Sequence, residues 1–561
     1  MKFSDTNREM LPIWLSSDEA KYLPETNLIH KKTSKLDYTN TTQQILTEFS
    51  KSNTVGTAIE LLNIATIEKD TEAAFKAAQF LSLERNLPQP LQRTINRILG
   101  LSTSDQSTSS EHSIKSLRQV INYNPNNPLA WLNISREYAI VGEKEKSRKC
   151  MLTALHLAKD HRWITRTAAR AFVHYDEKDI AHSIILKSSN LKNDPWLIAT
   201  EMAVARLNDK ETKFWKAGKK LLDSGLDAIH KTELASSFGT LELLDGATKK
   251  AKGYFKQSLI NPNKNSLAQA KWAERRNGIK NLVQVSQAQK HNAYEAQYWE
   301  AYTQKNMTAA LSYAQSWLKE EPYSSGPPMA ISYLAALLDD YELINSTTDK
   351  GLIANPDNTT LKLNRIFAWV ATLDVGHITN KDAVSAERYI KELKDIIKDS
   401  QWYDSAHAMA NIGMLSYRLG NLEQGRQRYE KAAEYFTAND SSAKIVLYVN
   451  HLREALISEA TWAKDILVAT QKLLTKNSSS TTPGAEFYLE KILLLEKEPG
   501  LWKQKFKNLN GGHPANSQIS RKLDASDTVS IQTLDSIFWL PPEFENTYNL
   551  SSFTKVKNNK K

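Results

Sequence analysis

The chain of 561 residues contains a single cysteine, Cys150, and little glycine or proline. A lone cysteine excludes an intramolecular disulfide framework, and without a CxxC pair it cannot anchor a thiolate zinc site by itself. Only 19 glycines and 17 prolines interrupt a sequence rich in Ala, Leu, Lys and Glu, so helix is favoured over sheet. We therefore expect an essentially all-α protein of the reducing cytosol.

Targeting segments and long apolar runs are missing as well. Residues 1–24 have no basic head followed by an apolar stretch of signal length, and no run of about 18 apolar residues occurs in the sequence. We expect neither secretion nor a membrane span, and no membrane partner. The 73 Lys and Arg residues exceed the 63 Asp and Glu residues, which gives a formal charge of +10. That excess is modest for this length and only weakly favours anionic partners.

Motifs that place phosphates, zinc or a nucleophilic serine are also absent: GxGxxG, GxxxxGK[ST], HExxH and GxSxG do not occur. The twelve histidines are scattered, and His156 and His161 are five positions apart, a poor spacing for one helix face. We expect Cys150 to be a half-buried structural residue and not a reactive thiolate. The sequence thus predicts no metal, no cofactor and no enzymatic activity.

The chain does contain a helical-hairpin pattern that returns about every 34 residues. Asn-Pro or Asp-Pro steps mark it at Pro125, Pro195, Pro262 and Pro356. In the clearest copy, residues 126–158, Trp131 and Tyr138 lie seven positions apart on one helix, Gly142 opens the turn, and Ala154 lies on the return helix. Such a repeat unit cannot bury its apolar face alone, so neighbouring units must stack.

Small residues recur in the other copies where two helices approach closely, and bulky residues stand beside them. They include Ala235, Gly239, Ala251 and Phe255; Tyr294, Tyr298, Ala301, Ala310, Ala314 and Trp317; and Gly413, Tyr417, Gly420, Tyr429 and Ala432. These residues resemble the tetratricopeptide repeat family, as a degenerate array of bacterial type over about residues 55–474. The resemblance implies an all-α, right-handed superhelical solenoid of antiparallel helix hairpins.

Three regions follow from this pattern. Residues 1–40 form an irregular N-terminal leader, in which LPIW either packs on the first hairpin or extends to a partner. Residues 41–475 form the solenoid, with a Ser/Thr-rich loop at 102–111, and residues 476–561 supply capping helices and an aromatic and basic tail. The aperiodic stretch SIFWLPPEFENTYNLSSF, residues 536–553, is expected to lie across a groove of its own protein or of a partner.

A basic stripe is the first candidate binding site. Its members are Arg162, Arg166, Arg170 and His174, four positions apart on one helix, with Asn133 and Arg136 of the preceding copy. The family resemblance places first helices along a concave groove, where we expect these charges to face solvent. They could clamp a carboxylate, a phosphate or an acidic segment through bidentate guanidinium bonds. The alternatives are a solvated basic face or pairing with Glu137 and Asp176.

An aromatic group is the second candidate. The same repeat register points Trp299, Tyr302, Tyr333, Asn364 and Phe367 toward the groove, where aromatic rings could hold a peptide or stack nucleobases. Tyr298 and Trp317 nearby are needed for packing, and a register error of one residue would exchange the two sets. Packing in the core is the favoured interpretation of this group.

The favoured function is a non-enzymatic scaffold or adaptor that binds a protein or peptide partner, with acidic character suited to the stripe. Resemblance to large arrays of this family suggests a regulatory, sensory or assembly subunit, working with a separately encoded effector such as a nuclease. The alternative is an RNA- or nucleotide-binding solenoid, which the stripe and the aromatic group support but which lacks a long basic face. An enzyme of unrecognised type is the least favoured alternative.

Overall fold

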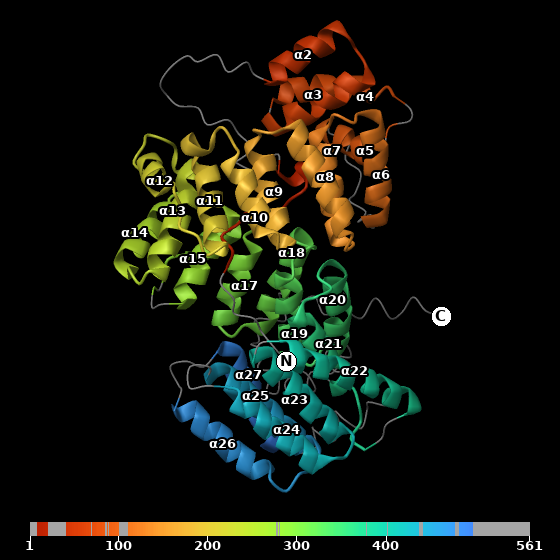
Figure 1. Ribbon diagram of the computed structural model, residues 1–561, viewed down its shortest axis with the longest axis vertical. Helices are drawn as coiled ribbons and strands as arrows, with labels where there is room; N and C mark the ends of the chain where they lie inside the picture. The colour runs from red at the N-terminus through yellow and green to blue at the C-terminus, as the bar shows by residue number, and fades with distance from the viewer. Residues whose placement is uncertain are drawn as a thin grey trace, which may run out of the picture. The chain divides into compact units, whose positions relative to one another are not determined.

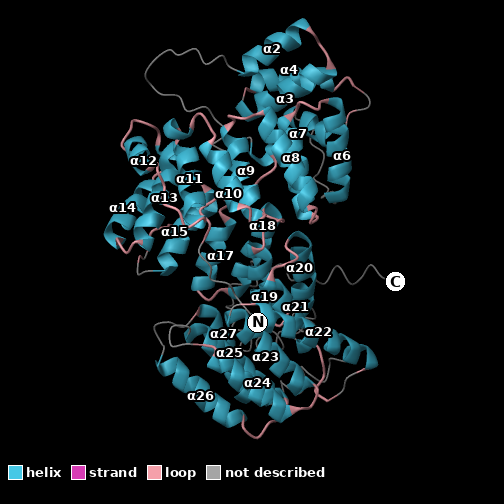
Figure 2. Ribbon diagram, in the orientation of Figure 1, coloured by secondary structure: helices cyan, strands magenta, loops and turns pink. Residues whose placement is uncertain are grey.

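The computed structural model describes residues 8–20 and 41–497, with gaps at 69, 85–86, 88, 100–109, 277–278, 280, 377–378, 401, 437–440 and 477–481. Every regular element in these ranges is a helix (Figures 1 and 2). The predicted all-α fold is therefore confirmed. In this part of the chain, no helix is long and apolar enough to cross a membrane. Most of the loop at 102–111 and the tail at 536–553 lie outside the described residues.

The described residues form two compact units. The N-terminal unit contains the residues up to Gln297 together with Lys319–Ser324, and the C-terminal unit contains Tyr298–Leu318 and the residues from Ser325 onward. The helices up to Gln297 are α1 (Ser17–Ala20), α2 (Thr41–Lys51), α3 (Val55–Glu68), α4 (Thr71–Leu81), α5 (Gln89–Ile98), α6 (Ser110–Tyr123), α7 (Pro128–Ile140), α8 (Lys144–Leu157), α9 (Arg162–His174), α10 (Lys178–Leu186), the 3-10 helix η2 (Leu191–Asn193), α11 (Pro195–Leu207), α12 (Trp215–Leu222), α13 (Ala228–Leu244), α14 (Thr248–Ser258), α15 (Lys264–Arg276), α16 (Val285–Lys290) and the start of α17 (Tyr294–Thr303).

The remaining helices also follow one another along the chain with short connections. They are α18 (Met307–Glu320), α19 (Gly326–Leu337), α20 (Tyr341–Ala354), α21 (Thr359–Ala371), α22 (Asn380–Asp399), α23 (Trp402–Arg418), α24 (Leu422–Glu434), α25 (Ser441–Ile457), α26 (Ala463–Lys476) and α27 (Pro483–Lys497). Consecutive helices pair into hairpins, such as α7 with α8, α13 with α14 and α23 with α24. The predicted array of helical hairpins is thus present in both units.

Glycine allows the two helices of a hairpin to approach closely. A Cβ atom on Gly239 of α13 would lie 3.1 Å from the ring of Phe255 on α14, and one on Gly425 of α24 would lie 2.5 Å from Cδ2 of Tyr417 on α23. Real Cβ atoms essentially never show a contact of 2.5 Å, and a contact of 3.1 Å is tighter than nine in ten of theirs, so both positions favour the small residue. The small and bulky residues of the sequence pattern therefore meet across each hairpin.

The turn inside many hairpins ends the first helix with one residue in the left-handed region. The residues are Gly142, Asp176, Asp209, Gly246, Lys305, Asp339, Gly420 and Glu459, with φ between 52° and 81°. The residue after it then bonds back to the helix: Glu143 N donates to Tyr138 O at 2.9 Å. This 6→1 bond satisfies a helix-end carbonyl, as in a Schellman motif. Copies without glycine keep the same turn, which explains how degenerate repeats retain the fold.

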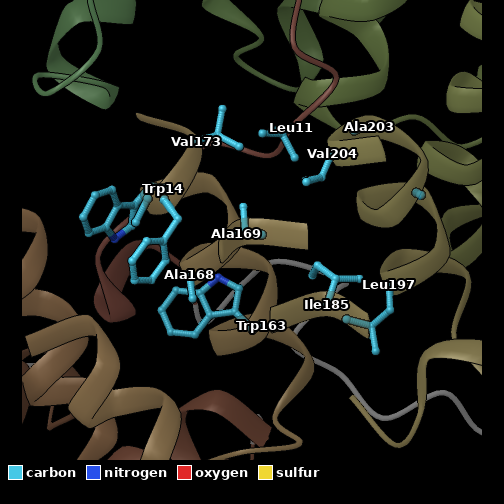
Figure 3. Packing of buried hydrophobic residues seen from close by; sticks show 14 of the residues in the cluster. Leu11, Trp14, Trp163, Ala168, Ala169, Val173, Ile185, Leu197, Ala203 and Val204 are labelled. Carbon is cyan, nitrogen blue, oxygen red and sulfur yellow. The ribbon is translucent and has the colours of Figure 1, made fainter. Parts of the chain in front are cut away.

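The core of the N-terminal unit includes residues from far outside the repeats. Helices α9 and α11 are each the first helix of a hairpin. Their alanines, such as Ala168, Ala169 and Ala203, are fully buried and let the two helices approach one another. Leu11 and Trp14, from residues 8–20, belong to the same apolar cluster (Figure 3). We call residues 8–20 the leader segment. The residues of the first helices that contact the leader segment form the candidate functional site.

Candidate functional site

The leader segment lies against the first helices of the N-terminal unit, without regular secondary structure before the single turn of α1 (Figure 1). Residues of α7, α9, α15, α17 and the turn Lys319–Ser324 contact it. We call this set the leader site; the polar side chains that bond to the segment are Asn133, Arg136, Arg170, Asn265, Gln269, Glu295 and Tyr323, and Glu321 lies 3.7 Å from Arg170 beside them.

The middle of the leader segment is held by its main chain. The backbone N–H of Trp14 donates to Tyr323 Oη at 2.8 Å, and Arg136 Nε donates to the Trp14 carbonyl at 3.0 Å. Asn265 Nδ2 donates to the carbonyl of Met10 at 3.3 Å. Bonds to backbone groups do not depend on the side chains of the segment, so they fix its path and not its sequence.

A second set of contacts holds the start of α1. Asn133 on α7 accepts a hydrogen bond from the Ser17 backbone N–H at 2.8 Å through its Oδ1. Its Nδ2 donates to the Ser17 Oγ at 2.8 Å. The side-chain amide therefore satisfies both the N–H and the hydroxyl of one residue. This pair of bonds requires a residue with both groups at position 17.

Ion pairs hold the other end of the leader segment. Arg8 Nε donates to the Glu295 carboxylate at 2.8 and 3.0 Å, and its NH1 donates to Asn265 Oδ1 at 2.7 Å and to Gln269 Oε1 at 3.1 Å. Glu9 carries the opposite charge and accepts from Arg170 NH1 at 2.8 Å. The leader site thus offers one anionic and one cationic position to adjacent residues, which discriminates strongly between segments.

Apolar side chains of the leader segment fill the space between these polar contacts. Trp14 is completely buried, with its ring 5.2 Å from that of Tyr323, and Leu11 and Leu15 are 5% and 6% exposed. Figure 3 shows Leu11 beside Val173 of α9 and Val204 of α11. Burial of one such side chain contributes about 1.5–3 kcal/mol. The apolar contacts therefore contribute substantially to holding the segment, and the polar contacts fix its direction and register.

The charges of α9 at this site are shifted by their surroundings. Burial, and then the positive charges of Arg170 and Lys144, lower the pKa of His174 to about 3, so its imidazole is neutral at physiological pH. Burial alone would lower the pKa of Arg170, but Glu9, Tyr323 and Glu321 outweigh it and the pKa is raised. Arg170 thus stays charged inside the site, and its partners are carboxylates of the same chain.

The structure brings together most of the predicted basic stripe. Asn133, Arg136 and Arg170 contact the leader segment, and the ring of His174 lies 5.5 Å from that of Tyr323. Arg166 is directed elsewhere, because it bonds to Glu233 and Thr200. The expectation of charges facing solvent is wrong: Arg136, Arg166 and Arg170 are 7%, 1% and 9% exposed. Residues of the same chain cover them.

The aromatic group lies in the C-terminal unit. Tyr302 and Tyr333 are 5% and 3% exposed, with their hydroxyl oxygens 3.4 Å apart, and the N–H of Gly484 at the start of α27 donates to Tyr302 Oη at 3.3 Å. Asn364 is buried and donates to Ser332 Oγ at 2.9 Å. Trp299 is half-buried, with its ring 4.6 Å from Tyr298. These four residues therefore take part in packing within the unit.

Several residues of the leader site were missed in the sequence. Asn265 and Gln269 lie four positions apart on α15 and are 6% and 1% exposed. Polar residues at first-helix positions in successive copies were the signal that pointed to Asn133 and Arg136, and the same rule would have found this pair. Glu321 and Tyr323 flank Pro322 in a turn between hairpins, where no helical period applies. Only the structure shows that these two residues belong to the surroundings of the leader segment.

Other candidate chemistry finds no support in the described residues. Cys150 is 8% exposed, and burial raises the pKa of its thiol to about 11, so a thiolate is disfavoured. Among residues 8–20 and 41–497, outside the gaps, no three His, Cys, Asp or Glu side chains are grouped so that they could hold a metal ion. The leader site is thus the best-developed arrangement of polar and apolar groups.

No protein-family model and no curated protein matches the sequence. Solved structures with some similarity include the APC/C hetero-tetramer Cut9-Hcn1, with a TM-score of 0.36 and 11% identity over 86% of this chain and 92% of that one. The human IFIT1 dimer with PPP-AAAA has a TM-score of 0.28 and 13% identity, over 82% of this chain and 96% of that one. Naa15/Naa10 bound to HypK-THB has a TM-score of 0.19 and 10% identity, over 92% and 96%. By its own hairpins and their packing, the chain is a tetratricopeptide-like helical array.

Proposed function

We propose that the chain is a non-enzymatic helical-repeat adaptor of the cytosol, which binds an extended segment of a partner protein at the leader site. The observation that carries this proposal is the recognition of main-chain groups: Tyr323, Arg136 and Asn265 bond to the backbone of Trp14 and Met10. A site built in this way can accept another segment with suitable side chains. The leader segment occupies it until a partner competes.

The contacts of the leader segment indicate which residues a partner segment should carry. Arg170 favours an acidic residue in the position of Glu9, and the space occupied by Trp14 favours a large aromatic side chain five residues later. A regulatory or assembly subunit of a multi-protein system, whose partner releases the leader segment, fits this arrangement. We assign partner binding to Asn133, Arg136, Arg170 and His174. Arg166 and the aromatic group are left out, because their contacts serve packing inside the chain.

The basic stripe does not support the alternative that the chain binds RNA. Arg170 lies 2.8 Å from the carboxylate of Glu9 and 3.7 Å from that of Glu321, which is 5% exposed. A phosphate would have to displace Glu9 from Arg170, and a nucleic acid has no peptide N–H to donate to Tyr323 Oη as Trp14 does. The geometry supports a protein segment more strongly than a nucleic acid.

Rebinding of the leader segment tests the proposal. A protease site is inserted within residues 21–40 of the full chain, and the folded protein is cleaved and freed of its leader by dilution and gel filtration. A fluorescent peptide of residues 8–20 is then added, and polarisation is measured. We expect saturable binding that weakens at least tenfold in the Arg170→Met variant, because one charged hydrogen bond is lost. The exposed Arg206→Met serves as the matched control. A peptide that fails to rebind to a fully helical protein would contradict the proposal.

A further inference from the structure

Helices α12 and α14 carry lysine as their only charged residue type. Their sequences, WKAGKKLL and TKKAKGYFKQS, contain three and four lysines and no Asp, Glu or Arg. Second helices of other hairpins, namely α8, α10, α18, α20, α22, α24 and α26, all contain Asp or Glu. The two lysine helices therefore depart from the mixed charge of the array.

The lysines lie on the outer faces of these helices. The exposed residues that share a face are Lys216, Lys219 and Lys220 on α12 and Lys249, Lys252 and Lys256 on α14. On α14 they recur at intervals of three and four positions, which places them in one row. The opposite side of α14 carries the buried Ala251 and Phe255. We call the six lysines the lysine surface.

The two helices of the lysine surface are neighbours in the N-terminal unit (Figure 1). The ring centre of Phe238 on α13 lies 4.3 Å from that of Trp215 on α12 and 5.2 Å from that of Tyr254 on α14. Gln257 Nε2 on α14 donates to the carbonyl of Leu222, the last residue of α12, at 3.5 Å. The two groups of lysines therefore belong to one continuous surface.

The positive charge of this surface is not balanced within the chain. Among the described residues, none of its six ammonium groups has a salt bridge. By contrast, Lys250 on α14 lies 4.0 Å from Glu242, and Lys146 on α8 lies 2.9 Å from Glu143. Like charges three or four positions apart on a helix repel one another, and neither helix contains an acidic residue that would offset the repulsion. Charges of one sign gathered in this way attract anions.

A glycine and an exposed apolar residue lie beside the lysines of α14. Gly253 stands between Lys249 and Lys256, and a Cβ atom there would meet nothing within 4 Å. Packing within the protein therefore does not require this glycine, although glycine is unfavourable in the interior of a helix. Ile260, four positions after Lys256, is 71% exposed. A ligand that approaches the helix backbone at Gly253 and covers Ile260 accounts for both residues.

We propose that the lysine surface binds an acidic segment of a partner protein, one with successive Asp or Glu residues and an apolar residue that covers Ile260. The inference goes beyond the proposed function, since this surface shares no residue with the leader site. A nucleic acid fits the surface less well. The two helices lack the arginines that bind phosphate in a bidentate manner, and the rings of Trp215 and Tyr254 are half-buried against Phe238 and not free to stack bases.

An acidic probe tests the inference on the full-length protein. A labelled peptide of eight glutamates followed by leucine is titrated with the protein, and polarisation is measured. We expect saturable binding that weakens at least about tenfold when the salt concentration rises from about 20 to 200 mM, because exposed charges are screened. The triple variant Lys249→Gln, Lys252→Gln and Lys256→Gln should bind the probe about tenfold more weakly. A peptide with glutamines in place of the glutamates should not bind.

Two further variants separate a binding role from a structural one. The matched control replaces three exposed lysines of α22, a helix of mixed charge, by glutamine and should leave binding of the probe unchanged; they are Lys391, Lys394 and Lys398. Gly253→Leu places a side chain in the middle of the lysine surface. It should weaken binding of the probe several-fold without lowering the free energy of unfolding, since leucine is the better helix former.

The outcomes separate this inference from the proposed function. The triple lysine variant should still bind the 8–20 peptide after removal of the leader segment. If the 8–20 peptide rebinds and the acidic probe does not bind, the inference is wrong and the proposed function stands. Equal losses in the lysine variant and the α22 control would also contradict the inference. Tighter binding of a ten-nucleotide uridine RNA, or of phosphatidylserine vesicles, than of the probe would assign the surface to nucleic acid or lipid and overturn it.

Discussion

The buried pair between Arg166 and Glu233 gives the sharpest prediction about the solenoid. Arg166 is 1% exposed; its NH2 bonds to the Glu233 carboxylate, and its Nε donates to Thr200 Oγ1 at 3.1 Å. Its guanidinium also lies 5.0 Å from the centre of the Trp196 ring. Replacement by Met leaves the Glu233 charge buried without its partner, which costs about 3–5 kcal/mol. We expect Arg166→Met to lower the free energy of unfolding by that amount.

Urea unfolding followed by circular dichroism measures this loss. The matched control is Arg206→Met on the neighbouring helix α11, because the ion pair of Arg206 with Asp209 is 3.9 Å long and largely exposed. We expect that control to cost less than about 1 kcal/mol. Replacing both Arg166 and Glu233 by Met should cost less than the single change, since no buried charge remains unpaired. A single-variant loss below about 1 kcal/mol would refute the assignment of this pair as a buried structural contact.

Three further predictions concern the leader, the hairpins and pH. Trp14→Ala should speed proteolysis within residues 8–20 at least tenfold while the helical content measured by circular dichroism stays nearly unchanged, because the segment can leave the site on its own. Gly425→Ala should destabilise by about 1–3 kcal/mol through overpacking, whereas Gly253→Ala, with nothing within 4 Å of its added Cβ, should stabilise slightly in urea unfolding. Burial lowers the pKa of His451 from 6.5 to about 3. The neutral imidazole therefore contributes fully to the free energy of unfolding above pH 6.5, and this contribution declines as the pH falls. Between pH 7 and 5 wild type should lose about 2 kcal/mol more than His451→Gln in urea titrations.

The sequence predicts the fold because its information is local. Small and aromatic residues at fixed spacing specify how two adjacent helices meet, as Gly239 and Phe255 do across α13 and α14. The same local rule places Asn133 and Arg136 beside Arg170, since neighbouring first helices stack nearly in register. The hairpins therefore follow from residue spacing, and the convergence of Asn133, Arg136 and Arg170 follows from that spacing together with the family resemblance.

The occupant of the site could not be derived in this way. Arg136 bonds to Trp14 across 122 positions, and Tyr323 bonds to Trp14 across 309. No periodicity reports contacts at such separations, and the segment that contains LPIW carries no helical signal. A stripe of like charges was expected to face solvent because its carboxylate partners, Glu9 and Glu321, lie in irregular segments. The interpretation of the sequence failed where the chain folds back on its repeats.

The central claim is that the leader site recognises one extended segment through Trp14, and one comparison tests it most directly. The dissociation constants of the 8–20 peptide and of its Trp14→Ala form are measured by polarisation on the cleaved protein. Loss of a fully buried tryptophan costs about 3–5 kcal/mol, so the alanine peptide should bind at least about 100-fold more weakly. Equal affinities for the two peptides would contradict the account.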